Sequence, residues 1–385
     1  MTAPAPVAAP VAAAELPFFP PDLFEGDREH LLRIVHEVAV DPAQKFILGP
    51  HTARLEAVLR EQLGAADVVA CGSGTSGLTL VLAALGVGPG DEVVVPAFGC
   101  APLASTVVAL GAVPVFADVD PWTMVVDPDA MERRITPRTR ALMPAHMFSV
   151  MADLPRIGSL AEQYRLRLVE DSAVAQGGVL DGVPAGLAGE AGVYSFVQVK
   201  TFGMAGEGGV VVTRDAEIGR TVRMLRNHGQ DGRTRFLHHR IGWNSRFDEV
   251  MAAFQLHRLP GLAARLERRA RIAERYTAAF ADLSERGVLA PPPGREGRCY
   301  YVYTLLVERR NALQAHLAEL GIGSHAYYPL PLPRQAAFAR YAAVGDDWPA
   351  AQHAAERALS IPVYPHLTDA DVERIVDAVR RFAIR

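Results

Sequence analysis

Three separate segments carry residues whose types and positions could do chemistry together. The stretch VVACGSGTSGLTLVLAALG, residues 68–86, places glycines at 72, 74 and 77 between a short apolar run and a helical-looking one. Asp171 follows the apolar run LRLVE, and Lys200 lies just beyond the apolar run GVYSFV, with further glycines close behind it. Because a buried ammonium group is costly without a purpose, this lysine is a candidate for chemistry.

The glycine spacing is that of a dinucleotide-binding loop, but the rest of the dinucleotide pattern is missing. Such a site needs an acidic residue at the far end of the second strand, about 20 residues on, to bind the ribose. The second strand is predicted at EVVVPAF, with Asp91 and Glu92 at its start and Pro96, Ala97 and Phe98 at its end. None of the residues at that end can accept a hydrogen bond from a ribose hydroxyl, so the dinucleotide interpretation fails.

The same loop remains compatible with a phosphate site. It leads into a helix start, where free backbone N–H groups and the helix dipole favour an anion, and Thr75 and Ser76 add hydroxyl donors. Taken alone, the loop is explained equally well as an ordinary Gly/Ser helix cap. Asp171 could likewise be the N-cap of a helix.

Together, the three segments favour one cofactor, pyridoxal phosphate (PLP). A lysine that can lose its proton in a dry pocket can form an imine with the cofactor and can move protons as a base. A carboxylate at a strand end can keep the pyridine nitrogen protonated, so that the ring withdraws electrons. The glycine-rich helix start would hold the phosphate. The residues thus predict a PLP site with Lys200 and Asp171 as its catalytic groups.

Alternating strands and helices are predicted to position these groups. Short β-branched runs such as EVVVPA, VPVFADV and RLVED are separated by helix-length segments, the pattern of βαβ units around a mostly parallel sheet. A long helical stretch follows Asp248 with Pro260 as a kink, and PPPG marks a boundary before an alternating, antiparallel-type strand. We therefore predict four parts: a flexible N-terminal tail (1–25), a large PLP-binding α/β domain (26–255), a connecting helix (256–290) and a smaller C-terminal α+β domain (291–385).

Composition argues against several other classes of protein. The chain has 385 residues, 50% of them hydrophobic, and its net charge of −4 gives no electrostatic case for nucleic-acid binding. Its cysteines, Cys71, Cys100 and Cys299, show no metal-ligand spacing, so neither a metal site nor a disulfide framework is expected. The most apolar zone, 93–119, is interrupted by proline and glycine. We therefore expect no membrane span and a cytoplasmic protein.

From about residue 45 to its end, the chain resembles the DegT/DnrJ/StrS family of PLP-dependent sugar aminotransferases. The motifs that carry the resemblance, in the family's order, are GSGTSGL, PGDEVVVPAF, GAVPVFADVD, EDSA, SFVQVK…GEGG, RNHG, GWNSRFDEVMAAFQL, YYPLPLPRQAAF and LSIPVYPHLT. The resemblance implies the aspartate-aminotransferase-like fold, which is fold type I of PLP-dependent transferases. It also implies transfer of an amino group from glutamate or glutamine to a keto-sugar, preferably nucleotide-linked, in amino-sugar or antibiotic biosynthesis.

The resemblance also implies roles for individual residues. Lys200 matches the lysine that forms the imine with PLP, and Asp171 matches the partner of the pyridine nitrogen. The residues that match the family's phosphate ligands within one chain are Gly74, Thr75 and Ser195, the last of them five residues before the lysine.

Three further matches concern the subunit interface and the substrate pocket. Asn244 in GWNSR matches an asparagine that reaches the phosphate from the other subunit, which implies a homodimer with a shared active site. His228 in RNHG and Tyr328 in YYP fall where the family lines its substrate pocket. For these two residues, packing in the core is an equally good explanation.

Four positions depart from the family pattern. Cys100 stands where the family commonly stacks an aromatic ring on PLP, and Val174 stands where a polar side chain commonly follows the aspartate. Pro333 replaces the usual histidine of the YP-x-PLH segment, and Gln198 is reminiscent of the aminocyclitol branch. The departures bear on the substrate and on how the cofactor ring is held, and they leave the proton-transfer residues intact.

Three alternatives to a keto-sugar aminotransferase stay open at this point. The first keeps the chemistry and changes the acceptor to a keto-cyclitol. The second is a PLP-dependent sugar dehydratase, although such relatives carry histidine where this chain has Lys200. The third is a PLP-binding regulator without turnover, which a DNA-binding appendage would support, and the sequence shows none.

Overall fold

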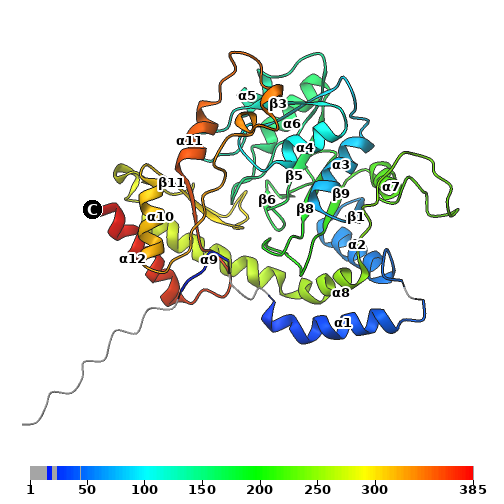
Figure 1. The fold of residues 1–385 in the computed structure, drawn as a ribbon, viewed down its shortest axis with the longest axis horizontal. Coiled ribbons are helices and arrows are strands. Elements are labelled where there is room, and N and C mark those ends of the chain that lie inside the picture. The colour runs from blue at the N-terminus through cyan, green and yellow to red at the C-terminus, as the bar shows by residue number, and fades with distance from the viewer. Residues whose placement is uncertain (1–14, 20–23, 44, 385) are drawn as a thin grey trace, which may run out of the picture.

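A seven-stranded sheet forms the centre of the larger unit in the computed structural model, which describes residues 15–19, 24–43 and 45–384 (Figure 1). The strand order is β1-β9-β8-β5-β4-β2-β3. The bounds are β1 (Asp67–Cys71), β2 (Glu92–Pro96), β3 (Val113–Ala117), β4 (Thr139–Leu142), β5 (Arg167–Asp171), β8 (Ala191–Ser195) and β9 (Gly209–Thr213). Neighbours from β3 to β8 pair in parallel, whereas β9 is antiparallel to both β8 and β1. The mostly parallel sheet predicted from the β-branched runs is therefore present.

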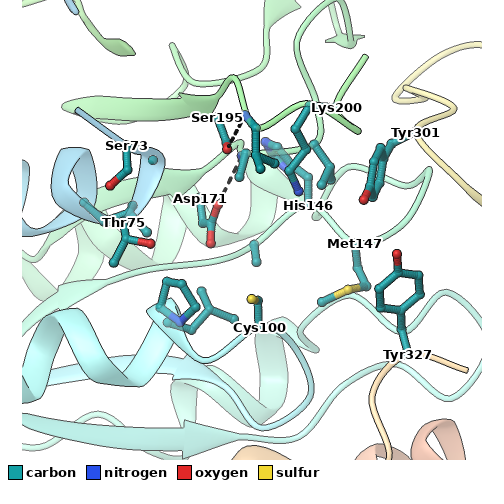
Figure 2. A pocket seen from close by; sticks show the side chains of 18 of the residues that line it. Ser73, Thr75, Cys100, His146, Met147, Asp171, Ser195, Lys200, Tyr301 and Tyr327 are labelled. Atoms are coloured by element: carbon teal, nitrogen blue, oxygen red, sulfur yellow. Dashed lines mark hydrogen bonds between the residues drawn. The ribbon is translucent and has the colours of Figure 1, made fainter. Parts of the chain in front are cut away.

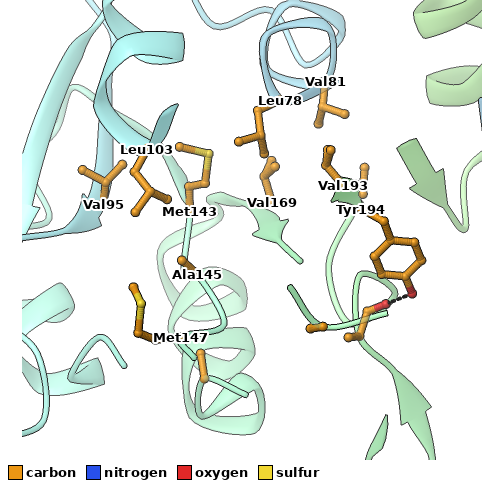
Figure 3. Close-up of a cluster of buried hydrophobic side chains, with 14 of the residues drawn as sticks. Leu78, Val81, Val95, Leu103, Met143, Ala145, Met147, Val169, Val193 and Tyr194 are labelled. Atoms are coloured by element: carbon orange, nitrogen blue, oxygen red, sulfur yellow. Dashed lines mark hydrogen bonds between the residues drawn. The ribbon is translucent and has the colours of Figure 1, made fainter. Parts of the chain in front are cut away.

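Helices connect the strands and pack on the sheet, as parallel pairing requires (Figure 1). They are α2 (Pro50–Leu63), α3 (Gly74–Ala84), α4 (Pro102–Ala109), α5 (Pro128–Glu132), α6 (Leu154–Tyr164) and α7 (Ala216–Leu225). Apolar side chains of α3 and α4, such as Leu78 and Leu103, meet buried residues of the sheet and of the loop after β4 (Figure 3). This packing fixes the helix starts at the carboxyl ends of the strands. A two-stranded ribbon, β6 (Val179–Leu180) and β7 (Val183–Pro184), lies outside the main sheet.

A smaller unit follows in sequence around a three-stranded antiparallel sheet in the order β10-β11-β12. Its elements are α9 (Leu262–Phe280), β10 (Val288–Leu289), β11 (Tyr303–Val307), α10 (Arg310–Glu319), α11 (Pro349–Arg357), β12 (Ala358–Ile361) and α12 (Asp369–Ile384). At Pro260, where the sequence predicts a kink, α8 (Glu249–Arg258) gives way to a short 3₁₀ turn before α9 begins. The exact boundaries of the domains remain a prediction.

Part of the predicted N-terminal tail is packed onto this smaller unit. The N–H group of Leu16 donates to the carbonyl of Gly321 (2.8 Å), and the N–H group of Gly323 donates to the carbonyl of Leu16 (2.7 Å). Residues 1–14 and 20–23 of the predicted tail lie outside the described residues. After the tail, α1 (Arg28–Val40) lies along α8 at the edge of the molecule (Figure 1).

Glu249, the first residue of α8, caps the start of α2 from a distant part of the sequence. Its side chain is 1% exposed and accepts hydrogen bonds from the N–H groups of Gly49 (2.7 Å), His51 (2.8 Å) and Thr52 (2.9 Å), and from the Thr52 hydroxyl. We expect Glu249→Ala to lower the free energy of unfolding by about 3 kcal/mol, because several buried donors would lose their acceptor.

Urea unfolding at fixed protein concentration measures this loss. The matched control is Glu217→Ala on the exposed surface of α7, where the carboxylate pairs with Arg220 in solvent. A loss no larger than that of the control would show that water replaces Glu249 at the helix start.

Candidate active site

A cavity of about 330 Å³ opens where the parallel strands end, between the two units (Figure 2). Eight of the ten residues predicted for the site line it: Gly74, Thr75, Cys100, Asp171, Val174, Ser195, Lys200 and Tyr328. They come from the start of α3, from the segments after β2 and β5, from the end of β8 and the turn after it, and from the smaller unit. A sheet of this type places its ligand groups at this edge.

The start of α3 has the features of a phosphate site. Ser73 caps the helix by accepting from the N–H group of Ser76 (3.0 Å), while the N–H groups of Gly74 and Thr75 have no acceptor within the described part of the chain. A Cβ atom at Gly74 would lie 3.0 Å from the Cβ of Ser195, a tight contact, so glycine favours the close approach of the loop to that serine. The free N–H groups and the Ser195 hydroxyl thus share a space that fits an anion.

Asp171 supplies a buried carboxyl group at the end of β5. It is 7% exposed, and its Oδ1 accepts from the N–H group of Ala173 at 3.1 Å. Burial raises the pKa of Asp171, although the Ala173 N–H and the charge of Lys200 oppose the rise. A cationic N–H group placed in the cavity would favour the carboxylate, which is the partner that a protonated pyridine nitrogen needs.

Lys200 lies in the turn that follows β8, with its Nζ 4.5 Å from the centre of the Tyr301 ring. Burial lowers the pKa of Lys200, and the charge of Asp171 opposes the fall. The amine form, which is the form that can act as a nucleophile or a base, is therefore favoured relative to an exposed lysine. The donor set of the cavity fits PLP at its phosphate, its ring nitrogen and its aldehyde carbon.

Two predicted residues do not line the cavity of their own chain. Asn244 is exposed, with its Oδ1 accepting from Arg246 Nε at 2.9 Å, although its neighbour Ser245 bonds to Ser76 at the start of α3 (2.7 Å). His228 is also exposed, with a positive φ of 58°. The intersubunit role of Asn244 and the substrate role of His228 remain predictions.

The cavity also contains residues that were not predicted from the sequence. The aromatic ones are Phe148, Tyr301 and Tyr327. Glu207, which is exposed to solvent, also lines the cavity. His146 could have been found, because it follows the apolar run ALMPA at a strand end in the same way as Asp171. Nothing local in the sequence indicates that the tyrosines of the distant smaller unit meet Lys200.

His146 and Glu170 form a buried pair beside the cavity. The N–H group of Ala152 donates to Nδ1 of His146 (3.1 Å), so the ring proton is on Nε2, which faces Glu170 Oε2 at 3.2 Å. Burial disfavours the Glu170 carboxylate, but His146 and the N–H group of Gly186 (2.7 Å) outweigh burial and lower the pKa of Glu170. The pair therefore joins the segment after β4 to β5, directly before Asp171.

The described ranges contain no helix that is both long and apolar enough to span a bilayer, and no cluster of three or more His, Cys, Asp or Glu that could hold a metal ion.

The fold combines a mixed sheet covered by helices with a smaller antiparallel unit, and its cavity places a lysine and an aspartate beside a helix start. These features define the class of PLP-dependent α/β transferases. Residues 28–380 match the DegT/DnrJ/EryC1/StrS aminotransferase family, and the chain belongs to that family. It is 39% identical over 355 residues to the UDP-N-acetyl-3-dehydro-alpha-D-glucosamine 3-aminotransferase of Acidithiobacillus ferrooxidans. The match covers 92% of this chain and 94% of that relative.

Two solved structures share the whole fold. The crystal structure of S. venezuelae DesV superposes with a TM-score of 0.91 at 35% identity, covering 96% of this chain and 99% of that one. NtdA from Bacillus subtilis, solved with the bound cofactor PMP, gives a TM-score of 0.90 at 27% identity over 98% of this chain and 87% of that one. The predictions of fold type I, PLP and aminotransferase activity are confirmed.

The presence of Cys100 in place of an aromatic residue is expected to affect how long the protein retains PLP. Its thiol lies in the cavity with Asp171 and Lys200, and burial raises its pKa, so the thiol is neutral. We expect Cys100→Phe to retain PLP about 2- to 10-fold longer during dialysis, because an aromatic ring can stack on the cofactor. Cys100→Leu, which adds bulk without a ring, is the control. Faster loss of PLP from the Phe variant, or failure to fold, would mean that Cys100 is needed for packing.

Proposed function

We propose that this aminotransferase moves the amino group of glutamate or glutamine to a keto-sugar, preferably a nucleotide-linked one, in amino-sugar or antibiotic biosynthesis. The observation that carries the proposal is the meeting of Lys200, Asp171 and the free start of α3 in one cavity. The acceptor is inferred from the A. ferrooxidans relative, whose name specifies a UDP-linked keto-sugar. We further propose that the protein is cytoplasmic, since its three cysteines are free and a reducing compartment suits them.

Each residue of the site has a distinct task in this reaction. PLP, when bound, takes up the amino group and withdraws electrons from the carbon that carries it. The N–H groups at the start of α3 and the Ser195 hydroxyl would hold the phosphate, and Asp171 would hold the proton on the ring nitrogen. Lys200 Nζ would act as the base that moves the proton between the substrate carbon and the cofactor. The aromatic side chains that line the cavity limit the access of water.

We also propose that the active site is shared across a homodimer, with Asn244 reaching the partner's phosphate site. Asn244 lies in an exposed segment that presents Phe236 (71% exposed) and Ile241 (91% exposed) to solvent. Apolar side chains gathered in this way are typical of an interface, and two-fold dimers are the commonest symmetric assembly.

Subunit mixing tests the shared site. Lys200→Ala and Asn244→Ala are each expected to be weak alone, and in a mixed dimer one site carries both defects while the other is intact. Random exchange of an equal mixture should therefore recover about a quarter of wild-type activity, because half of the dimers are mixed. Native mass spectrometry confirms the exchange. Exchange without any recovery would place Lys200 and Asn244 in one chain's site or in different sites.

An acceptor screen tests the proposed reaction. The protein is incubated with glutamate or glutamine, freed of the donor, and mixed separately with UDP-linked 3-keto-sugars, keto-cyclitols and simple keto acids. Mass spectrometry detects each amine, and the return of the cofactor's aldehyde absorbance gives the rate. The highest kcat/KM is expected with a nucleotide-linked keto-sugar. A preference for keto-cyclitols would move the protein to aminocyclitol biosynthesis, and no amine from any acceptor would overturn the proposal.

A further inference from the structure

The Lys200 amino group rests against an aromatic ring. Its Nζ lies 4.5 Å from the centre of the Tyr301 ring, and in the described ranges no group accepts a hydrogen bond from it. Asp171 and Glu207 act on Lys200 through their charge alone. Tyr301 itself is 7% exposed and belongs to the smaller unit, two residues before β11 begins. The contact therefore joins two parts of the chain that are about a hundred residues apart.

The Tyr301 ring is fixed by groups from other segments. Arg269 of α9 is 6% exposed, and its Nη1 donates to the carbonyls of Tyr301 (3.0 Å), Tyr300 (3.4 Å) and Val363. The ring of Phe19 lies 6.2 Å from the Tyr301 ring, centre to centre. The backbone and the ring of Tyr301 are therefore both held by contacts from other segments, and the Lys200 side chain reaches the ring.

We propose that Tyr301 is a positioning residue whose ring face holds the Lys200 amino group whenever the lysine is not bonded to the cofactor. During amino transfer the lysine is free while it moves protons, and it must stay near the reacting carbon in both its charged and its neutral form. A carboxylate in this place would bind the ammonium strongly and resist loss of its proton. A ring face attracts the ammonium more weakly and releases the amine readily. The inference rests on the proposed role of Lys200.

The strength of this contact can be varied without changing the shape of the side chain. Position 301 is replaced by phenylalanine and then by 4-fluoro-, 3,5-difluoro- and 3,4,5-trifluorophenylalanine, because each fluorine withdraws electron density from the ring face. The full-length protein is loaded with pyridoxamine phosphate, so that Lys200 is free. Acetylation of Lys200 is then followed against pH by peptide mass spectrometry. The sequence contains one other lysine, Lys45, which is exposed and serves as the reference in the same sample.

The pH midpoint of Lys200 labelling should fall steadily along the series, by about half a unit to one unit in total. The direction follows because the ring face stabilises the ammonium form, so weakening it lowers the pKa. The Lys200 midpoint of Tyr301→Phe should match that of the wild type, and the Lys45 midpoint should not move along the series. The turnover number should change along the series while the KM of the acceptor stays constant.

A pH midpoint of Lys200 labelling that stays constant along the fluorinated series would overturn the inference and show that Tyr301 only fills space. A shift already complete in Tyr301→Phe would also overturn it, because the hydroxyl group, which interacts with that of Tyr327, would then be responsible. The labelling does not depend on which acceptor the protein uses. Failure of the acceptor screen would therefore leave this result standing, and a constant midpoint would leave the proposed reaction untouched.

Discussion

Lys200→Ala is expected to slow amino transfer by at least about 10³-fold, since the variant loses both the nucleophile and the base. The first half-reaction, from glutamate to the pyridoxamine form of the cofactor, isolates this effect because no acceptor is needed. The proposed phosphate site at the start of α3 is unchanged in the variant, so PLP should still bind, although without a covalent link. Stopped-flow absorbance measures the half-reaction, and equilibrium dialysis measures binding.

The covalent link itself can be located without ambiguity in this chain. Lys200 and Lys45 are its only lysines, and Lys45 is exposed and lies outside the cavity. Borohydride reduction of the PLP-loaded protein followed by peptide mapping should place the pyridoxyl group on Lys200, and Lys45→Arg should change neither the label nor the rate. A label on Lys45 would remove Lys200 from its assigned role.

Asp171→Asn is expected to slow the same half-reaction by about 10²- to 10³-fold, because the amide cannot stabilise a positive charge on the ring nitrogen. The substitution preserves shape, and the amide oxygen can still accept from the N–H group of Ala173. Asp153→Asn at the start of α6, where an amide can also cap the helix, is the matched control. Turnover of Asp171→Asn at the wild-type rate would reassign the acid.

The same variant should be more stable than the wild type when the cofactor is absent. Burial raises the pKa of Asp171 in the folded protein, so the folded state favours its protonated form. The contribution of this group to stability is therefore greatest below its unfolded pKa and is lost as the pH rises through the folded value. At pH 7 the neutral asparagine removes this penalty, and urea unfolding of the cofactor-free proteins should show a higher midpoint for Asp171→Asn.

The sequence predicted the parts of the site that depend on one strand and the turn after it. Asp171 and Lys200 follow apolar runs, and the glycines before α3 allow a close approach, so both signals are local. Tyr301 and Tyr327 were not found because their role depends on how the smaller unit lies against the sheet. No periodicity over a short window encodes that contact.

Pairing at the edge of the sheet was another feature that local patterns could not supply. The strand β9 lies between β1 and β8, antiparallel to both, and this position comes from long-range pairing. Local patterns cannot supply the role of the exposed Asn244 either, because its proposed function requires a second chain. Local patterns alone therefore do not identify residues that act across units or subunits, and Asn244 and Tyr328 were named only through the family resemblance.

Contact between the N-terminal segment and the wall of the cavity has a practical consequence for handling the protein. Phe19 packs on Tyr301, and Phe18 stacks on His325 with ring centres 5.8 Å apart. An affinity tag fused close to these residues, or a protease cut just after them, would disturb the support of Lys200, the proposed catalytic lysine. The C-terminus, which follows α12 at the periphery of the molecule (Figure 1), is the safer place for a purification handle or an immobilisation linker.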